Sequence, residues 1–254
     1  MQDKYVGDIG DFGKYALLQS LAKRDVPLGI VWYLTNDAGS KGDGAFIQYL
    51  SSPSEAGGLG SCDAQLFSVL CKIVHRHDRR VARIKELAIF PQTTEFFEER
   101  LDFKDVPAQD RCDRRKRWLQ SALRHVEGAA LVFLDPDNGL SLNERIRCRK
   151  NGPKYVFLDE TLQFLSRGQS LIIYCHQDRR KGGLAEQVRQ GIQLFCEKGP
   201  TGRAWAFTFH RKSVRIYFVV PSCEWMRDLL AERSREFRGG CFGAGGHFRL
   251  EGCV

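Results

Sequence analysis

An apolar run in the middle of the chain ends abruptly in acidic, proline and amide residues. The run is Leu-Val-Phe-Leu at 131–134. This pattern is typical of a buried strand that ends in a loop, and parallel α/β sheets bind their ligands at the carboxyl ends of strands. The same residues favour a plain turn on propensity alone, which is the alternative. If they face a cleft, three catalytic candidates follow: Asp135, Asp137 and Asn138.

A second polar segment, at 174–183, places a histidine beside an acid and several cations. His176 follows an apolar run and precedes Asp178. One or two carboxylates hold Mg²⁺ together with water and phosphate oxygens, and a histidine can act as a general base. One hypothesis is therefore a metal-dependent nuclease or phosphodiesterase, with Asp135 and Asp137 on the metal and His176 as the base. The alternative for His176 is a hydrogen-bonded residue at a strand end.

The elements that must position these residues alternate between strand and helix. A two-residue spacer, Arg211 and Lys212, separates two β-rich runs and predicts a hairpin near the end of the chain. Short apolar runs predict strands at 28–34, 130–135 and 170–175, and a strand followed by a turn at 80–91. Helical spacing of apolar residues predicts helices at 11–24, 63–76, 114–126, 156–166, 184–197 and 223–236.

This alternation predicts an α/β fold. We expect a Rossmann-like, mostly parallel sheet with helices on both faces and a C-terminal antiparallel hairpin strand. The 254 residues are enough for one large domain spanning 1–254. Residues 45–127, at approximate bounds, are predicted to form a mainly helical insertion in it.

Positive charge is clustered along the chain. The formal net charge is +8, and clustered cations favour a polyanionic partner because they neutralise phosphates and release counterions. The alternative for each single cluster is a solvated face. Together the clusters predict nucleic acid as the partner, with DNA and RNA both open. The candidate contacts are Arg114, Arg115, Arg117, Arg179, Arg180 and Lys181.

Cysteine usage and hydropathy suggest where the protein is found. The nine cysteines are odd in number and scattered, without the short spacing of a zinc site. We expect free thiols in a reducing compartment. No apolar run is long enough for a membrane helix, and the first residues lack the apolar stretch of a secretion signal. These features favour a cytoplasmic protein without a membrane partner.

Five short segments occur in an order that matches one known family. They are GDIGDFGKYALLQSL (7–21), YLTNDAGSKGDG (33–44), YLSSP (49–53), KELAIFP (85–91) and FLDPDNGL (133–140). In this order they resemble the N-terminal helix, the glycine loop, the Tyr-Pro-Gly-Ser-Pro segment, the Glu-Leu-His-Pro segment and the Asp-Pro-Pro-Tyr motif of one family. That family is the ribosomal RNA adenine-N6 methyltransferase J family, within the class I methyltransferases.

The resemblance implies S-adenosylmethionine as cofactor and an adenine N6 amine in nucleic acid as acceptor. In that family the aspartate and a proline carbonyl accept the amine hydrogens, and the tyrosine stacks on the flipped base. Asp135 and Pro136 are kept here, whereas Asp137 stands for the second proline and Asn138 for the tyrosine. A protein that keeps the sheet and binds nucleic acid without catalysis is a third hypothesis. The cofactor-binding residues that the resemblance implies are Asp11, Lys14, Asp37, Gly39, Gly42 and Glu86.

Overall fold

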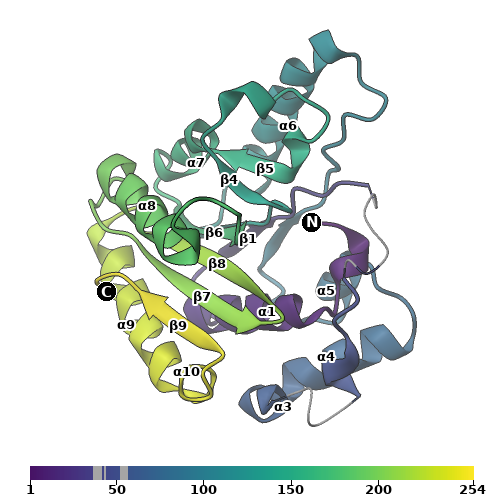
Figure 1. Ribbon diagram of the computed structural model, residues 1–254, viewed down its shortest axis with the longest axis vertical. Helices are drawn as coiled ribbons and strands as arrows, with labels where there is room; N and C mark the ends of the chain where they lie inside the picture. Colours follow the sequence, from purple (N-terminus) through teal and green to yellow (C-terminus); the bar gives the residue numbers. More distant parts are fainter. Residues whose placement is uncertain (37–41, 43, 52–56) are drawn as a thin grey trace.

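The computed structural model describes residues 1–36, 42, 44–51 and 57–254. In this part of the chain, seven strands form one sheet in the order β2-β1-β3-β6-β8-β7-β9 (Figure 1). The sheet is the centre of the fold, and the candidate site residues follow its strands. The strands are β1 (Leu28–Val31), β2 (Glu95–Phe97), β3 (Leu131–Leu134), β6 (Ser170–His176), β7 (Trp205–Arg211), β8 (Ser213–Val220) and β9 (Phe248–Glu251).

Strand direction confirms the predicted fold class, a Rossmann-like α/β sheet. Strands β2, β1, β3 and β6 are parallel, whereas β8 pairs antiparallel with both β6 and β7. Lys212 makes the predicted hairpin turn with a positive φ of 60°. Val31 pairs with Leu134, which in turn pairs with Ile173. The residues that follow β1 and β3 therefore emerge side by side at one edge of the sheet, next to the last residues of β6.

Helices cover both faces of the sheet and bury alternate strand residues. Ile30 and Phe133 pack on one face, and Val31 and Leu134 pack on the other, as the two-residue period of a strand requires. Figure 1 shows the helices in two layers on either side of the sheet. The first layer contains α1 (Ile9–Ala22), α4 (Ala64–His75) and α9 (Glu224–Gly239), and the second contains α6 (Arg111–His125), α7 (Leu158–Leu165) and α8 (Gly183–Lys198).

Shorter elements connect these helices and strands along the chain. A second, two-stranded sheet pairs β4 (Gly139–Ser141) with β5 (Tyr155–Phe157) in parallel. It lies directly after the Asp-Pro-Asp-Asn segment. The short helices are α3 (Leu59–Cys62), α5 (Ala82–Glu86) and α10 (Cys241–Ala244), with 3-10 turns at Asp3–Tyr5, Gln48–Leu50, Ala108–Asp110, Glu144–Ile146 and Gly152–Lys154.

Helix α1 begins at a side-chain cap and packs closely against the hairpin. Asp8 accepts a hydrogen bond from the Gly10 backbone N–H at 2.9 Å, which satisfies one of the free donors of the first turn. At Gly13 a Cβ atom would lie only 2.8 Å from the ring of buried Phe209 on β7. The absence of a side chain at position 13 therefore allows the helix to approach the hairpin.

One predicted strand is wrong. Residues 80–91, predicted as a strand and a turn, contain the short helix α5 instead. The edge strand β2 lies further along the chain at Glu95–Phe97 and pairs with β1. The segment 45–127 contributes the strand β2 to the central sheet and the helix α6 to one of its faces.

The expectation that all cysteines are free thiols is also wrong. Disulfides join Cys62 to Cys241 and Cys112 to Cys148, which bring together segments 179 and 36 residues apart. The first links α3 to α10, and the second links the start of α6 to the loop after β4. Where the structure describes the chain, it contains no helix with the length and apolar character needed to cross a bilayer.

Candidate functional site

A cavity of about 440 Å³ lies at the carboxyl ends of β3 and β6, and we call it the central cavity. Residues from α1, from the segment after β3 and from β8 line it, so the fold brings together positions that are far apart in the sequence. Eight of the residues singled out from the sequence are among them. They are Asp11, Lys14, Gly42, Asp135, Pro136, Asp137, Asn138 and His176.

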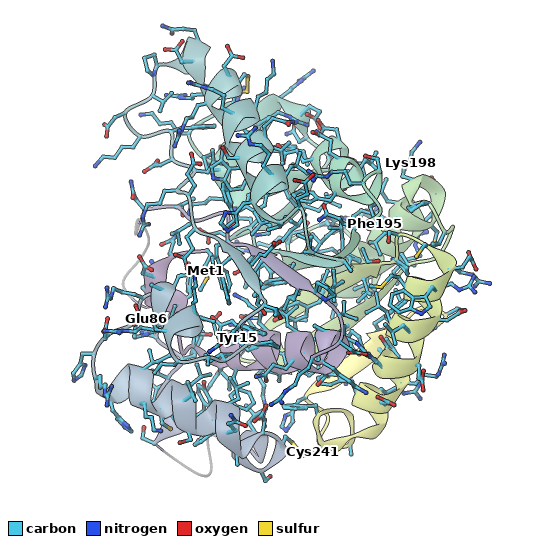
Figure 2. All side chains as sticks on the ribbon, turned by 180° about the vertical axis from the view of Figure 1, so that it is seen from behind. Met1, Tyr15, Glu86, Phe195, Lys198 and Cys241 are labelled. Atoms are coloured by element: carbon cyan, nitrogen blue, oxygen red, sulfur yellow. A yellow bond between two sulfur atoms is a disulfide. The ribbon has the colours of Figure 1, made fainter. Side chains whose placement is uncertain are left out.

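Lys14 lies between two buried carboxylates. Its Nζ is 2.8 Å from Asp11 Oδ1 and 2.8 Å from Asp135 Oδ2, and Tyr15 donates a further hydrogen bond to Asp11 at 2.8 Å. Burial alone would lower the pKa of Lys14, but the two carboxylates outweigh burial and hold that pKa above its ordinary value. Tyr15, labelled in Figure 2, belongs to α1.

Asp135 supplies a carboxylate that is only partly satisfied. Burial raises its pKa and outweighs the opposing effects of the Lys14 ammonium and the Met1 α-amino group. Lys14 binds Oδ2, while no described residue donates a hydrogen bond to Oδ1. Asp135 therefore retains an acceptor at a wall of the central cavity.

Asp137 is held by the N-terminal segment. Its Oδ1 lies 2.6 Å from the Met1 α-amino nitrogen, and Gln2 donates to Oδ2 at 2.6 Å. Lys154 is more distant, with Nζ 3.9 Å from Oδ2. Burial would raise the pKa of Asp137, but the α-amino group and Gln2 outweigh it and the pKa is lowered. The extra negative charge at this position is thus compensated within the protein.

Asp8 and Arg215 form a buried ion pair at the N-terminal end of α1. Arg215 Nη2 donates to Asp8 Oδ1 at 2.9 Å, and both residues line the central cavity. The sequence analysis missed Arg215, although strand alternation offers a signal. Arg215, Tyr217 and Val219 occupy one face of β8, and the last two are core residues. A cation in that series is expected to be buried with a partner.

Tyr174 and His176 lie together at the end of β6. The Tyr174 hydroxyl is 3.2 Å from His176 Nδ1, so the interpretation of His176 as a hydrogen-bonded strand-end residue holds, while it also lines the cavity. Burial raises the pKa of Tyr174 to about 12. Tyr174 therefore stays a neutral phenol that fixes the orientation of the imidazole.

One described cofactor candidate, Glu86, does not join this group. Glu86 is exposed on α5 (Figure 2). It pairs with Arg83 and does not line the central cavity. Because β2 ends at Phe97, the acid at the carboxyl end of that strand is Glu98. Asp37 and Gly39 lie outside the described residues.

The basic candidates divide into buried and exposed residues. Arg115 is only 2% exposed and forms a two-point ion pair with Glu160, at 2.5 and 2.8 Å. Its guanidinium is sealed inside the protein, so its assignment as a nucleic-acid contact is wrong. Arg114 approaches Glu99 at 3.3 Å at the surface, and Arg180 pairs with Asp178. The exposed members are Arg117, Arg179 and Lys181.

A second cavity of about 470 Å³ adjoins the first, and we call it the side cavity. Asn138 and His176 line both cavities. One wall of the side cavity comes from β4, β5 and the loop between them, and the other comes from the segment that joins β6 to α8. No described residue forms a hydrogen bond with the Asn138 side chain, which is exposed between the two spaces.

Metal ligands are not grouped in the part of the chain that is described. There, no three His, Cys, Asp or Glu residues come together in an arrangement that could hold a metal ion. Asp135 and Asp137, the two proposed ligands, instead bind Lys14 and the Met1 α-amino group. Their partners are protein cations.

The fold and site together define a Rossmann-like α/β protein with a charged cavity at the carboxyl ends of its strands. No protein-family model matches the chain, and no curated protein matches it. A solved structure, the crystal structure of protein LPL1258 from Legionella pneumophila str. Philadelphia 1 (DUF519), is similar with a TM-score of 0.48 and 10% sequence identity. The match covers 96% of each chain.

Proposed function

We propose that this protein is an S-adenosylmethionine-dependent methyltransferase that acts on an adenine N6 amine in nucleic acid. The observation that carries the proposal is the meeting of two segments, which the family resemblance assigns to one site. Lys14 of α1 binds Asp135 of the Asp-Pro-Asp-Asn segment at 2.8 Å across 121 residues of sequence. Both segments line one cavity at the carboxyl ends of parallel strands, where such sheets bind ligands.

The charge of the central cavity suits a zwitterionic cofactor. Four carboxylates line it, and each lies near a cation of the protein. A bare divalent cation would have to displace these partners, whereas a ligand that carries both an ammonium and a carboxylate can exchange with them. The cofactor, when bound, supplies a methyl group on a sulfonium cation. Gly42 also lines the cavity, and a Cβ there would meet no described atom within 4 Å, so the backbone at this position faces open space.

The protein groups near Asn138 can hold and orient an amine. Asp135 Oδ1 accepts one hydrogen bond, and the Pro136 carbonyl, to which no described residue donates, accepts another. The Asn138 side-chain amide can donate to a ring nitrogen or accept from the amine. These three groups recognise the hydrogen-bonding edge of a base.

An aromatic ring is available from a different part of the chain. The resemblance implies a stacking tyrosine where this chain has Asn138. Phe46 lines the central cavity and is 40% exposed, and Tyr5 lines it as well. A base held by Asp135 could stack on Phe46, as flipped bases do in enzymes that modify them. The sequence analysis did not single out Phe46, since it follows a glycine-rich loop without periodic spacing.

Calorimetry and a transfer assay test the proposal. Titration with S-adenosylmethionine should give saturable heat, and tritium should pass from labelled cofactor to single-stranded RNA or DNA. Asp135→Asn should lower the transfer rate about 100-fold or more, because the amine loses a charged acceptor. Glu86→Gln is the matched control, since Glu86 is exposed and outside the cavity, and it should leave the rate unchanged.

The opposite outcomes are equally clear. Absence of binding heat together with absence of transfer would overturn the methyltransferase proposal. Mg²⁺-dependent cleavage of nucleic acid that is lost in the double variant Asp135→Asn, Asp137→Asn would favour the nuclease hypothesis. Salt-sensitive binding without either activity would favour the non-catalytic one.

A further inference from the structure

Exposed apolar side chains mark the two cavities. Among the described residues, the large hydrophobic side chains that are exposed are Phe46, Leu142 and Trp225, at 40%, 63% and 64%. Phe46 lines the central cavity and Leu142 lines the side cavity, whereas Trp225 lies on α9 and lines neither. Each cavity thus has an apolar surface beside its polar wall, which is the combination that binds a nucleobase.

The side cavity offers a second place for a base. Its volume is within the range of small-molecule sites, and the residues that line it include Tyr155 of β5 and Leu142. Asn138 and His176 separate this space from the central cavity. Two bases bound on either side of Asn138, one in each cavity, would belong to adjacent nucleotides of one nucleic-acid strand.

Exposed cations lie close in the chain to residues that line the side cavity, in the β4–β5 segment and in the segment before α8, which we call its two rims. On the β4–β5 side, Arg145, Arg149 and Lys150 are exposed, and no acidic partner of theirs is found among the described residues. On the α8 side, Arg179 and Lys181 are exposed in the same way. Cations on both rims of a cavity with an apolar surface suit a sugar-phosphate backbone that passes over it.

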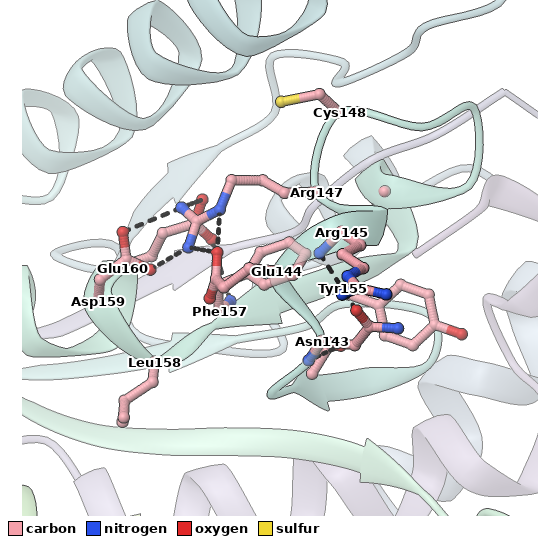
Figure 3. Close-up of polar contacts among 12 residues, drawn as sticks. Asn143, Glu144, Arg145, Arg147, Cys148, Tyr155, Phe157, Leu158, Asp159 and Glu160 are labelled. Atoms are coloured by element: carbon pink, nitrogen blue, oxygen red, sulfur yellow. Dashed lines mark hydrogen bonds and ion pairs between the residues drawn. The ribbon is translucent and has the colours of Figure 1, made fainter.

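The β4–β5 wall is held in place by contacts behind it. Arg147 binds Glu144 at 2.6 Å and Asp159 at 2.9 Å, and its guanidinium lies 4.4 Å from the Phe157 ring centre (Figure 3). Arg115 donates to the Gly152 carbonyl at 2.9 Å. The Cys112–Cys148 disulfide fixes the same loop to α6. The wall is therefore preformed, which limits the entropy lost when a ligand binds.

We propose that the side cavity binds the nucleotide next to the target adenine in a single-stranded nucleic acid. The neighbouring base packs on Tyr155 and Leu142, and the cations of the two rims contact the flanking phosphates. This inference rests on the proposed function and specifies its substrate class. A stacked duplex cannot place two adjacent bases in two separate cavities, so the strand must be unpaired or splayed at the target.

Fluorescence anisotropy without cofactor tests the side cavity directly. Short labelled single strands that contain one adenine are compared with strands that carry an abasic site next to that adenine. Tyr155→Ala and Leu142→Ala should each weaken binding of the intact strand about tenfold, in line with the loss of one stacked base. The abasic strand should bind the wild-type protein about tenfold more weakly, and the two variants should weaken it no further.

Trp225→Ala is the matched control, because Trp225 is as exposed as Leu142 but lies outside both cavities. It should bind the intact strand like the wild-type protein. Leu142→Ser provides a variant without folding risk, since the side chain is already in solvent. Equal affinity of the Leu142 and Tyr155 variants and the wild-type protein for the intact strand would overturn the inference, as would an equal loss in Trp225→Ala.

The outcome separates the two proposals. Cofactor binding and methyl transfer with no effect of the abasic neighbour would leave the methyltransferase proposal standing and refute the side-cavity inference. Abasic-sensitive binding without cofactor binding would do the reverse: it would support the second base site and refute the methyltransferase.

Discussion

Two buried charge clusters of similar composition differ in what surrounds them. In the central cavity, Lys14 joins Asp11 and Asp135. Behind the β4–β5 wall, Arg115 joins Glu160. Lys14 and Arg115 are almost equally inaccessible, at 4% and 2% exposure. Burial alone therefore does not distinguish a ligand site from a structural ion pair.

The hydrogen-bond partners do distinguish them. Arg115 donates to both Glu160 oxygens and to the carbonyls of Gly152 and Tyr155. Its guanidinium therefore joins parts of the protein to one another and does not face a ligand. In the other cluster, no described residue donates to Asp135 Oδ1 at the cavity wall, and one ammonium serves two carboxylates. The closed cluster supports the wall of the side cavity, and the open one offers groups to a ligand.

The largest effect is expected from opening the closed cluster. Arg115→Met removes the two-point ion pair and leaves the buried Glu160 carboxylate only the more distant Arg147, at 3.6 Å, which should lower the free energy of unfolding by about 3–5 kcal/mol. Urea denaturation measures the change. Arg117→Met, two residues along the same helix and exposed, should stay within about 0.5 kcal/mol of the wild-type protein. Similar decreases in the free energy of unfolding for the two variants would contradict the buried ion pair of Arg115 with Glu160.

A smaller loss of stability and a larger loss of binding are expected at the open cluster. Lys14→Met removes the shared cation, but water can enter from the cavity, so unfolding should become easier by only about 2 kcal/mol. S-adenosylmethionine binding should be lost, because two repelling carboxylates then face the cavity. Calorimetry of the folded variant checks the second part. Retained affinity would show that Lys14 does not organise a ligand site.

The smallest effect concerns the pH dependence of Asp137. Its pKa is lowered from an ordinary value of 3.8, so its ionised form stabilises the folded state above about pH 4, and this stabilisation disappears as the pH falls through the lower, folded-state pKa. Asp137→Asn should cost about 1 kcal/mol at neutral pH. The difference from the wild-type protein should shrink in denaturation curves recorded below pH 4, and a constant difference would contradict the assignment.

The sequence was sufficient for most of the sheet because its strands are apolar and regularly spaced. β1, β3, β6 and the β7–β8 hairpin are such runs, and they lie where they were predicted. The convergence of α1 with the segment after β3 followed from the resemblance and the rule on strand ends. β2 could not be found in this way, since two phenylalanines between acids carry no periodic signal and pairing with β1 makes them a strand.

Where the structure differs from the predicted site and its surroundings, the cause is element type, side-chain direction or pairing between distant segments. The resemblance placed Glu86 among the cofactor-binding residues, but the expected strand at 80–91 is the helix α5, and Glu86 is exposed on it. Arg115 had a usable signal: with Trp118, Leu119 and Ala122 it completes an i, i+3, i+4, i+7 stripe on α6, and these are buried residues. A basic run was thus interpreted as one surface although its members point in different directions. The disulfide partners, 179 and 36 residues apart, leave no local pattern.

The close contact at Gly13 connects the hairpin to the chemistry on the other side of α1. Lys14 is the next residue in the chain, and Asp11 lies two residues before Gly13. A methyl group at position 13 would collide with the Phe209 ring and push this part of the helix outward, and the Lys14 ammonium would move with it. A mutation that touches no ligand and adds no charge could therefore separate Lys14 from Asp135 and disable the cavity from behind.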